Sequence, residues 1–120
     1  MPRNNYSPFI GRAYEPPHGC LRLVEAVYRE VYGINLGSLD SGFAANDGTA
    51  LYRLLDRLTF QTQDPEEGDI ILLRSNPWHV GVYIQPGEML HSYQGGAGCI
   101  ERYNDLNWRA RVEGFYRYAG

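Results

Sequence analysis

Three side chains have the types and spacing that nucleophilic catalysis needs: Cys20, His79 and His91. Cys20 opens the segment Cys20–Tyr32, whose apolar residues recur at helical spacing. Unpaired N–H groups and the dipole at a helix start favour the thiolate, which is the nucleophilic form of cysteine. Because a thiol nucleophile also needs a base within reach, we expect the imidazole of His79 to serve it.

The two histidines lie in segments that we expect to pair as a hairpin. His79 begins the strand His79–Ile84, and alternation puts it on the face of Gly81, with open space beside the glycine. His91 lies in the next strand, Glu88–Ser92, after a short link. Paired strands bring side chains on one face to within about 5 Å. His91 can therefore accept a hydrogen bond from His79 and orient its ring.

Each of these residues also has a structural interpretation. A cysteine on an apolar helical stripe is often a small buried hydrophobe, and Cys99, in the middle of a strand segment, is expected to be structural. A strand histidine is often a hydrogen-bonded core residue. A zinc site is a further alternative, although the spacing matches no zinc signature; its ligands would be Cys20, His79, His91 and His18. We therefore expect no metal and no cofactor.

The elements that must position these residues form an α+β domain, with helices first and a sheet after them. Residues 1–19 contain several prolines and are expected to be an irregular lead-in. Residues 20–64 are the helical part, with a second short helix at about 49–58. Residues 65–120 should form an antiparallel sheet, because strands joined by short links pair antiparallel. The five expected strands are Asp69–Arg74, His79–Ile84, Glu88–Ser92, Gly98–Arg102 and Val112–Tyr118.

The composition predicts a single globular domain over residues 1–120. Apolar residues make up 43% and charged residues 21% of the chain, which excludes a disordered protein. The net charge of -3 argues against nucleic acid or an anionic membrane as the partner. No apolar run could span a membrane, and we expect no signal peptide. Two cysteines make no disulfide framework, and a single bridge between Cys20 and Cys99 stays open.

Five segments of the chain carry a family resemblance: GRAY at Gly11–Tyr14, the cysteine-headed helix ended by YGINL, EEGDIILL, HVGVYI and EMLHS. Their combination, from Phe9 to about Tyr118, resembles the NlpC/P60 family of papain-like cysteine peptidases. The resemblance implies helices packed on an antiparallel sheet of about five strands, and hydrolysis of peptidoglycan stem peptides without a cofactor. It also implies site roles: nucleophile for Cys20, general base for His79, orienting residue for His91 and an oxyanion-side hydroxyl for Tyr14.

The last third of the chain, GEMLHSYQGGAGCIERYNDLNWRARVEGFYRY, is similar to NlpC/P60 proteins of tailed phages and phage-like particles. That similarity implies that the protein is made in the host cytoplasm and is located in a phage or phage-like tail. It also implies tail-tip or baseplate proteins as partners, for which the candidate docking residues are Trp108, Arg109 and Arg111. Two alternatives stay open: a thiol acyltransferase, or a structural tail component without hydrolysis, since the family's usual D-C-S-G pattern is replaced at Gly19, Leu21 and Arg22.

Overall fold

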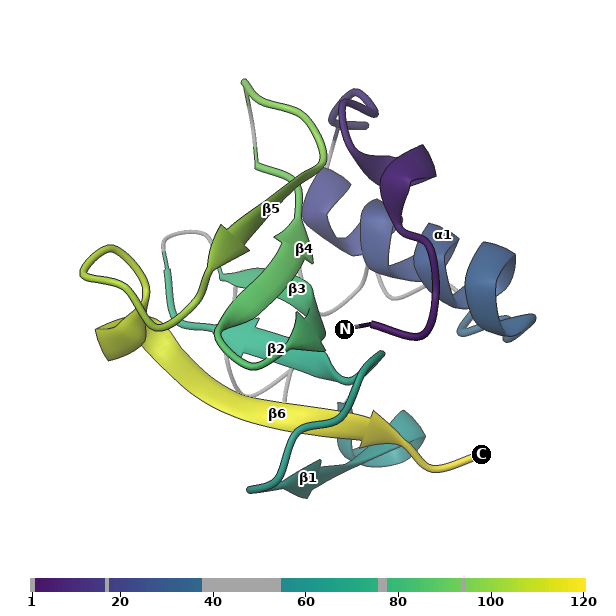
Figure 1. Cartoon of the computed structure of the whole chain (residues 1–120). Coiled ribbons are helices and arrows are strands. Elements are labelled where there is room, and N and C mark those ends of the chain that lie inside the picture. The colour runs from purple at the N-terminus through teal and green to yellow at the C-terminus, as the bar shows by residue number, and fades with distance from the viewer. Residues whose placement is uncertain (1, 17, 38–54, 76–77, 94) are drawn as a thin grey trace.

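The computed structural model describes residues 2–16, 18–37, 55–75, 78–93 and 95–120. Within them, one α-helix packs on one face of a six-stranded antiparallel sheet, which gives two layers (Figure 1). The strand order is β1-β6-β2-β3-β4-β5. The helical elements are η1 (Ser7–Phe9), α1 (Gly19–Tyr32) and η2 (Arg109–Arg111). The strands are β1 (Thr59–Thr62), β2 (Ile70–Leu73), β3 (His79–Gln85), β4 (Glu88–His91), β5 (Cys99–Arg102) and β6 (Val112–Tyr118).

Helix α1 forms where the apolar period predicted it, one residue earlier at its start. Its buried stripe includes Cys20, Val24 and Val27, which lie against β3 and the centre of the sheet. The helix ends at Gly33, which takes a left-handed backbone with φ 68° and donates its N–H to the carbonyl of Tyr28. The predicted helix at about 49–58 lies mostly outside the described residues, although residues 55–58 are helical.

The sheet has six strands and not the expected five. Strands β2 to β5 form the predicted succession of antiparallel neighbours, each paired with the next along the chain. The additional strand, β1, falls inside the range that was expected to be helical, and it pairs with β6. Strand β6 returns between β1 and β2. The partner of β1 is more than 40 residues away along the chain. The four residues of β1, TFQT, therefore could not predict this pairing by their own pattern.

The two faces of the sheet carry separate apolar clusters. Alternation along β3 is confirmed: Val80, Val82 and Ile84 pack in the main core with α1, whereas Tyr83 packs on the opposite face. Side chains from the segment between β5 and β6 pack on that opposite face, among them Tyr103 and Trp108, and Phe115 of β6 lies beside them. The face turned away from α1 is therefore a second protected environment for side chains.

The lead-in precedes α1 in the chain and runs alongside the helix (Figure 1). Near the end of α1, the hydroxyl groups of Tyr6 and Tyr32 lie 2.6 Å apart, and Tyr6 also donates to Glu67 at 2.8 Å. Farther along the lead-in, backbone hydrogen bonds of 2.8 Å join residues 11 and 12 to Gly98, just before β5. These contacts attach the lead-in to the end of α1 and to the segments before β2 and β5.

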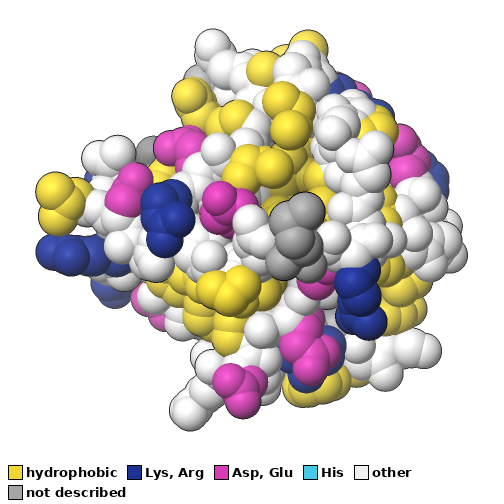
Figure 2. All heavy atoms as spheres, in the orientation of Figure 1, with side chains coloured by type: hydrophobic (Ala, Val, Ile, Leu, Met, Phe, Trp, Pro, Cys, Tyr) yellow, Lys and Arg dark blue, Asp and Glu magenta, His cyan; other side chains and the backbone are white. Residues whose placement is uncertain are grey.

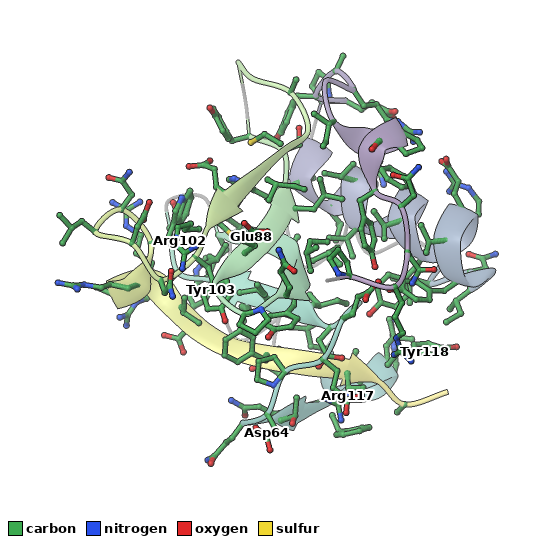
Figure 3. All side chains as sticks on the ribbon, in the orientation of Figure 1. Asp64, Glu88, Arg102, Tyr103, Arg117 and Tyr118 are labelled. Atoms are coloured by element: carbon green, nitrogen blue, oxygen red, sulfur yellow. The ribbon has the colours of Figure 1, made fainter. Side chains whose placement is uncertain are left out.

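One polar grouping and one strand register position strands that carry or support the site. Arg117 of β6 donates to both carboxylate oxygens of Asp69, at 3.1 and 2.9 Å, and to the carbonyl of Asp64 at 2.8 Å (Figure 3). At the far end of the β4–β5 pair, Glu88 lies opposite Arg102, beside Tyr103 (Figure 3). This register places His91 opposite Cys99.

The face shown in Figure 2 mixes charged side chains of both signs with apolar groups. Acidic and basic residues are interspersed there, and neither sign forms an extended patch on that face. No helix in the described ranges has both the length and the hydrophobicity needed to cross a lipid bilayer.

Candidate active site

The predicted contact between the two histidines is confirmed. His79 Nε2 and His91 Nδ1 lie 2.7 Å apart, with the rings nearly perpendicular. Hairpin register produces this contact, because Val82 pairs with Leu90 and the histidines then fall on one face of β3 and β4. Gly81 allows the approach, since a Cβ there would lie 3.3 Å from the Cβ of His91. The open space expected beside Gly81 is therefore wrong: side chains of β4 fill it.

A carboxylate that the sequence analysis missed continues the histidine pair. His91 Nε2 lies 2.6 Å from Glu101 Oε1, and the His91 side chain is fully buried. Glu101 lies two residues after Cys99 on β5, and Cys99 is opposite His91 on β4. The side chains of Glu101 and His91 are therefore on the same face of the sheet. The sequence shows a glutamate in the strand segment that follows His91, which was a weak indication of a partner for it. The register of β4 and β5 is what identifies Glu101 as the residue that reaches His91.

The three groups fix the positions of their protons. An ionised carboxylate only accepts hydrogen bonds, so Glu101 requires a proton on His91 Nε2. The Nδ1 atom of neutral His91 is then an acceptor, so His79 donates from Nε2. The lone pair of His79 is left on Nδ1, where it can accept a proton from a thiol. The relay Glu101–His91–His79 thus holds the imidazole in the tautomer that a general base needs.

Trp108 covers the relay. Its ring stacks on His79 with centroids 5.4 Å apart and an interplanar angle of 19°, and it meets His91 edge-on at 5.5 Å. Trp108 was expected on a docking surface, but the residue is half-buried and its ring packs against the two histidines. Burial, followed by the charge of His91, lowers the pKa of His79 to about 3. His79 is therefore a neutral imidazole at ordinary pH.

Cys20 is the second residue of α1 and its side chain is buried, with 5% of the residue exposed. Its sulfur interacts with backbone N–H groups of Val80, Leu21 and Cys20 itself. Val80 follows His79 directly, and consecutive Cα atoms are about 3.8 Å apart, so the thiol lies beside the residue that carries the base. The two cysteines are free, and no disulfide joins Cys20 to Cys99.

The expected thiolate is corrected by the structure. Burial raises the pKa of the Cys20 thiol, and the backbone N–H groups that lower it only partly offset this effect. The helix start is too well shielded from water for its dipole to stabilise a free thiolate. The thiol of Cys20 and the imidazole of His79 are therefore both neutral at rest, and the proton has to move during the reaction.

Tyr14 lies at the start of α1, as the resemblance implied. Its ring packs so closely on Gly19 that a Cβ at that position would lie 2.5 Å from Tyr14 Cδ1. Glycine before the nucleophile is thus required by the tyrosine ring. Next to it, His18 is the one non-glycine residue in the described ranges with a left-handed backbone, at φ 61°. Its carbonyl accepts hydrogen bonds from Leu21 and Arg22, which sets the first turn of α1.

Comparison with known families decides the relationship of the chain. A sequence model of the NlpC/P60 family matches residues 11–117. The chain belongs to the NlpC/P60 family. Members of this family are cysteine peptidases or amidases that hydrolyse cell-wall peptides. A search of curated protein sequences finds no match.

The residues around the nucleophile of this NlpC/P60 domain have places that explain their identity. Arg22 turns along the flank of α1 and pairs with Glu25 at 3.0 Å, where both side chains are largely buried. Leu21 is buried in the main core. The departures from the family's pattern at Gly19, Leu21 and Arg22 are therefore accommodated by packing and by an ion pair on the helix.

The low pKa of His79 predicts an unusual pH profile for this NlpC/P60 domain. His79 accepts a proton only when neutral, and it stays neutral down to a pH of about 3. A base with an ordinary pKa near 6.5 would be only about 3% neutral at pH 5. We expect kcat/KM on a stem-peptide substrate to keep more than half of its pH 7 value at pH 5. A loss of more than tenfold over that range would contradict the burial of His79.

The same group makes folding stability depend on pH. Its pKa is lower in the folded than in the unfolded chain, so the unfolded chain binds the proton first as the pH falls. The contribution of His79 to stability is complete above pH 6.5 and declines between pH 6.5 and about 3. Denaturant unfolding at pH 7 and pH 4.5 should show a larger loss in the parent than in His79→Phe. Equal losses would contradict this linkage.

Proposed function

We propose that this chain is a cysteine peptidase that hydrolyses amide bonds in peptidoglycan stem peptides. The observation that carries the proposal is the relay from Glu101 through His91 to His79, whose strand brings the Val80 amide to the Cys20 thiol. A neutral base held in one tautomer, on the residue before the one whose amide contacts a neutral thiol, suits acyl transfer from an amide. The family of the domain, whose members cleave cell-wall peptides, supports the substrate class.

The reaction has two stages. In the first, Cys20 Sγ attacks the amide carbonyl carbon while its proton moves to His79 Nδ1. The C–N bond then breaks, and the imidazolium of His79 returns this proton to the leaving amine. In the second stage, His79 takes a proton from water, the hydroxide attacks the thioester, and the peptide carboxylate leaves while the thiol of Cys20 is restored.

The oxyanion is formed at the start of α1. The backbone N–H of Cys20 lies in the first helical turn, where amide groups have no partner within the helix. We assign the stabilisation of the developing negative charge to this amide and to the hydroxyl of Tyr14, whose ring is held against Gly19. Because the tyrosine ring packs on Gly19 and the helix fixes the amide, this arrangement would need little reorganisation when substrate binds.

The role of the protein in a phage-like tail is the finer part of the proposal. The similarity of residues 87–118 to tail-associated members supports it, as do two exposed arginines, Arg109 and Arg111, that could contact a tail-tip or baseplate protein. Replacing both by alanine should reduce recovery of the domain in purified tail particles without unfolding it. Unchanged recovery would remove this surface from the tail proposal.

A structural component without hydrolysis is the second candidate, and the buried, neutral thiol of Cys20 favours it. The deciding experiment incubates purified protein with soluble peptidoglycan fragments and identifies the products by mass. We expect cleavage within the stem peptide by the parent and none by Cys20→Ala. A transferase would instead give fragments joined to an added amine. No mass change with the folded parent would favour the structural candidate.

A further inference from the structure

A group of metal-ligand side chains lies behind the histidine pair. His91 Nε2, Cys99 Sγ and a carboxylate oxygen of Glu101 all lie within 4.8 Å of one another. They come from two paired strands, because His91 is opposite Cys99 in the β4–β5 register and Glu101 follows two residues later on the same face. At the far end of this strand pair, Glu88 lies opposite Arg102 (Figure 3).

We propose that His91, Cys99 and Glu101 form a binding site for Zn²⁺ whose occupation disables His79 as a base. Imidazole, thiolate and carboxylate are the three ligand types that zinc uses in proteins. A thiolate and a carboxylate also balance the charge of the ion. This site is distinct from the one considered from sequence, because its cysteine is Cys99 and not the nucleophile.

Two of the three distances between ligand atoms suit a tetrahedral ion after a small adjustment. Ligand atoms around tetrahedral zinc are about 3.3–3.6 Å apart, given metal–ligand bonds of about 2.0–2.3 Å. The 3.8 Å between Cys99 Sγ and Glu101 Oε1 is already close to this value. The 2.6 Å between His91 Nε2 and Glu101 Oε1 has to widen by less than about 1 Å. Glu101 can supply that movement, because 34% of its side chain is exposed.

An open pocket reaches one of these ligands, Glu101. Its volume is about 390 Å³, and Glu101 forms part of its wall together with Tyr93, Asn107, Trp108 and Arg111. Water from this pocket could complete the coordination as a fourth ligand.

Zinc on His91 Nε2 would reverse the proton order of the relay. The Nε2 proton leaves to solvent, and neutral metal-bound His91 carries its one proton on Nδ1, taken from His79 Nε2. His79 regains one proton from solvent on Nδ1, which is the atom that must accept the thiol proton. Each ring keeps one proton, and the net release is the thiol proton of Cys99. Inhibition thus follows without any contact between the metal and Cys20.

Cobalt serves as a spectroscopic probe, and the two cysteines provide matched variants. Co²⁺ added to reduced parent protein should give a thiolate-to-cobalt charge-transfer band, which Zn²⁺ abolishes by displacing cobalt. The band should persist in Cys20→Ser and disappear in Cys99→Ser. Loss of the band in Cys20→Ser with retention in Cys99→Ser would overturn the assignment, as would no binding of either metal by the parent.

The inhibitory effect rests on the proposed peptidase function and is measured separately. With EDTA-treated parent as the fully active reference, Zn²⁺ should inhibit the parent, whereas Cys99→Ser should keep kcat/KM within about twofold of the parent. Removing a ligand should raise the inhibitory zinc concentration by roughly 100-fold. Equal zinc sensitivity of the two proteins would overturn the switch. If neither protein hydrolyses peptide, the cobalt spectra still decide the metal site.

Discussion

Replacing Cys20 by alanine is expected to lower kcat/KM on stem peptides by roughly 10⁴-fold or more, because no other group can form the thioester and members of a catalytic unit are not additive. The domain should still fold. The residue is small and buried in the main core, so loss of its sulfur should cost about 1 kcal/mol of unfolding free energy.

The matched control for this variant is Cys99→Ala, which removes the other free thiol of the chain. Its rate should remain within a few-fold of the parent, because Cys99 contacts Glu101 only weakly, at 3.8 Å. Steady-state rates and denaturant unfolding should be measured on all three proteins. Hydrolysis by Cys20→Ala at the parental rate would show that the nucleophile is wrongly assigned.

Replacing His79 by alanine is expected to be nearly as damaging as loss of Cys20, with a decrease of roughly 10³-fold or more in kcat/KM. The resting thiol is neutral because burial raises its pKa, so attack without a base is slow. His91→Ala should be milder, since water can partly replace an orienting group. Glu101→Gln should have the smallest effect, because an amide oxygen can still accept the proton of His91 Nε2.

This order of effects separates a relay from simple packing. Substrate affinity should change little across the three variants, since none of the roles assigned here involves binding the substrate, so the loss should appear in kcat. A His79→Ala protein with the parental rate would rule out the base. A loss in Glu101→Gln as large as in His79→Ala would show that the carboxylate does more than fix a tautomer.

The sequence by itself determined the parts of the site that depend on local pattern. The helical period placed Cys20 at the start of a buried helix, and the two-residue period of β3 put His79 on the face opposite the valines. The two-residue link between β3 and β4 then required the two histidines to lie near each other. These are interactions between residues close in sequence, for which spacing alone specifies geometry.

Only the tertiary structure decided the features that depend on distant segments or on shielding from water. The sixth strand forms because β6 returns to pair with β1, and the period of neither segment specifies that partner. Glu101 reaches His91 through the β4–β5 register, and Trp108 reaches His79 from a segment 29 residues later in the chain. The protonation states follow from the same cause. A helix start favours a thiolate when water is near, but here burial outweighs the dipole and leaves the Cys20 thiol neutral, since the cost of desolvating a charge depends on every segment that covers it.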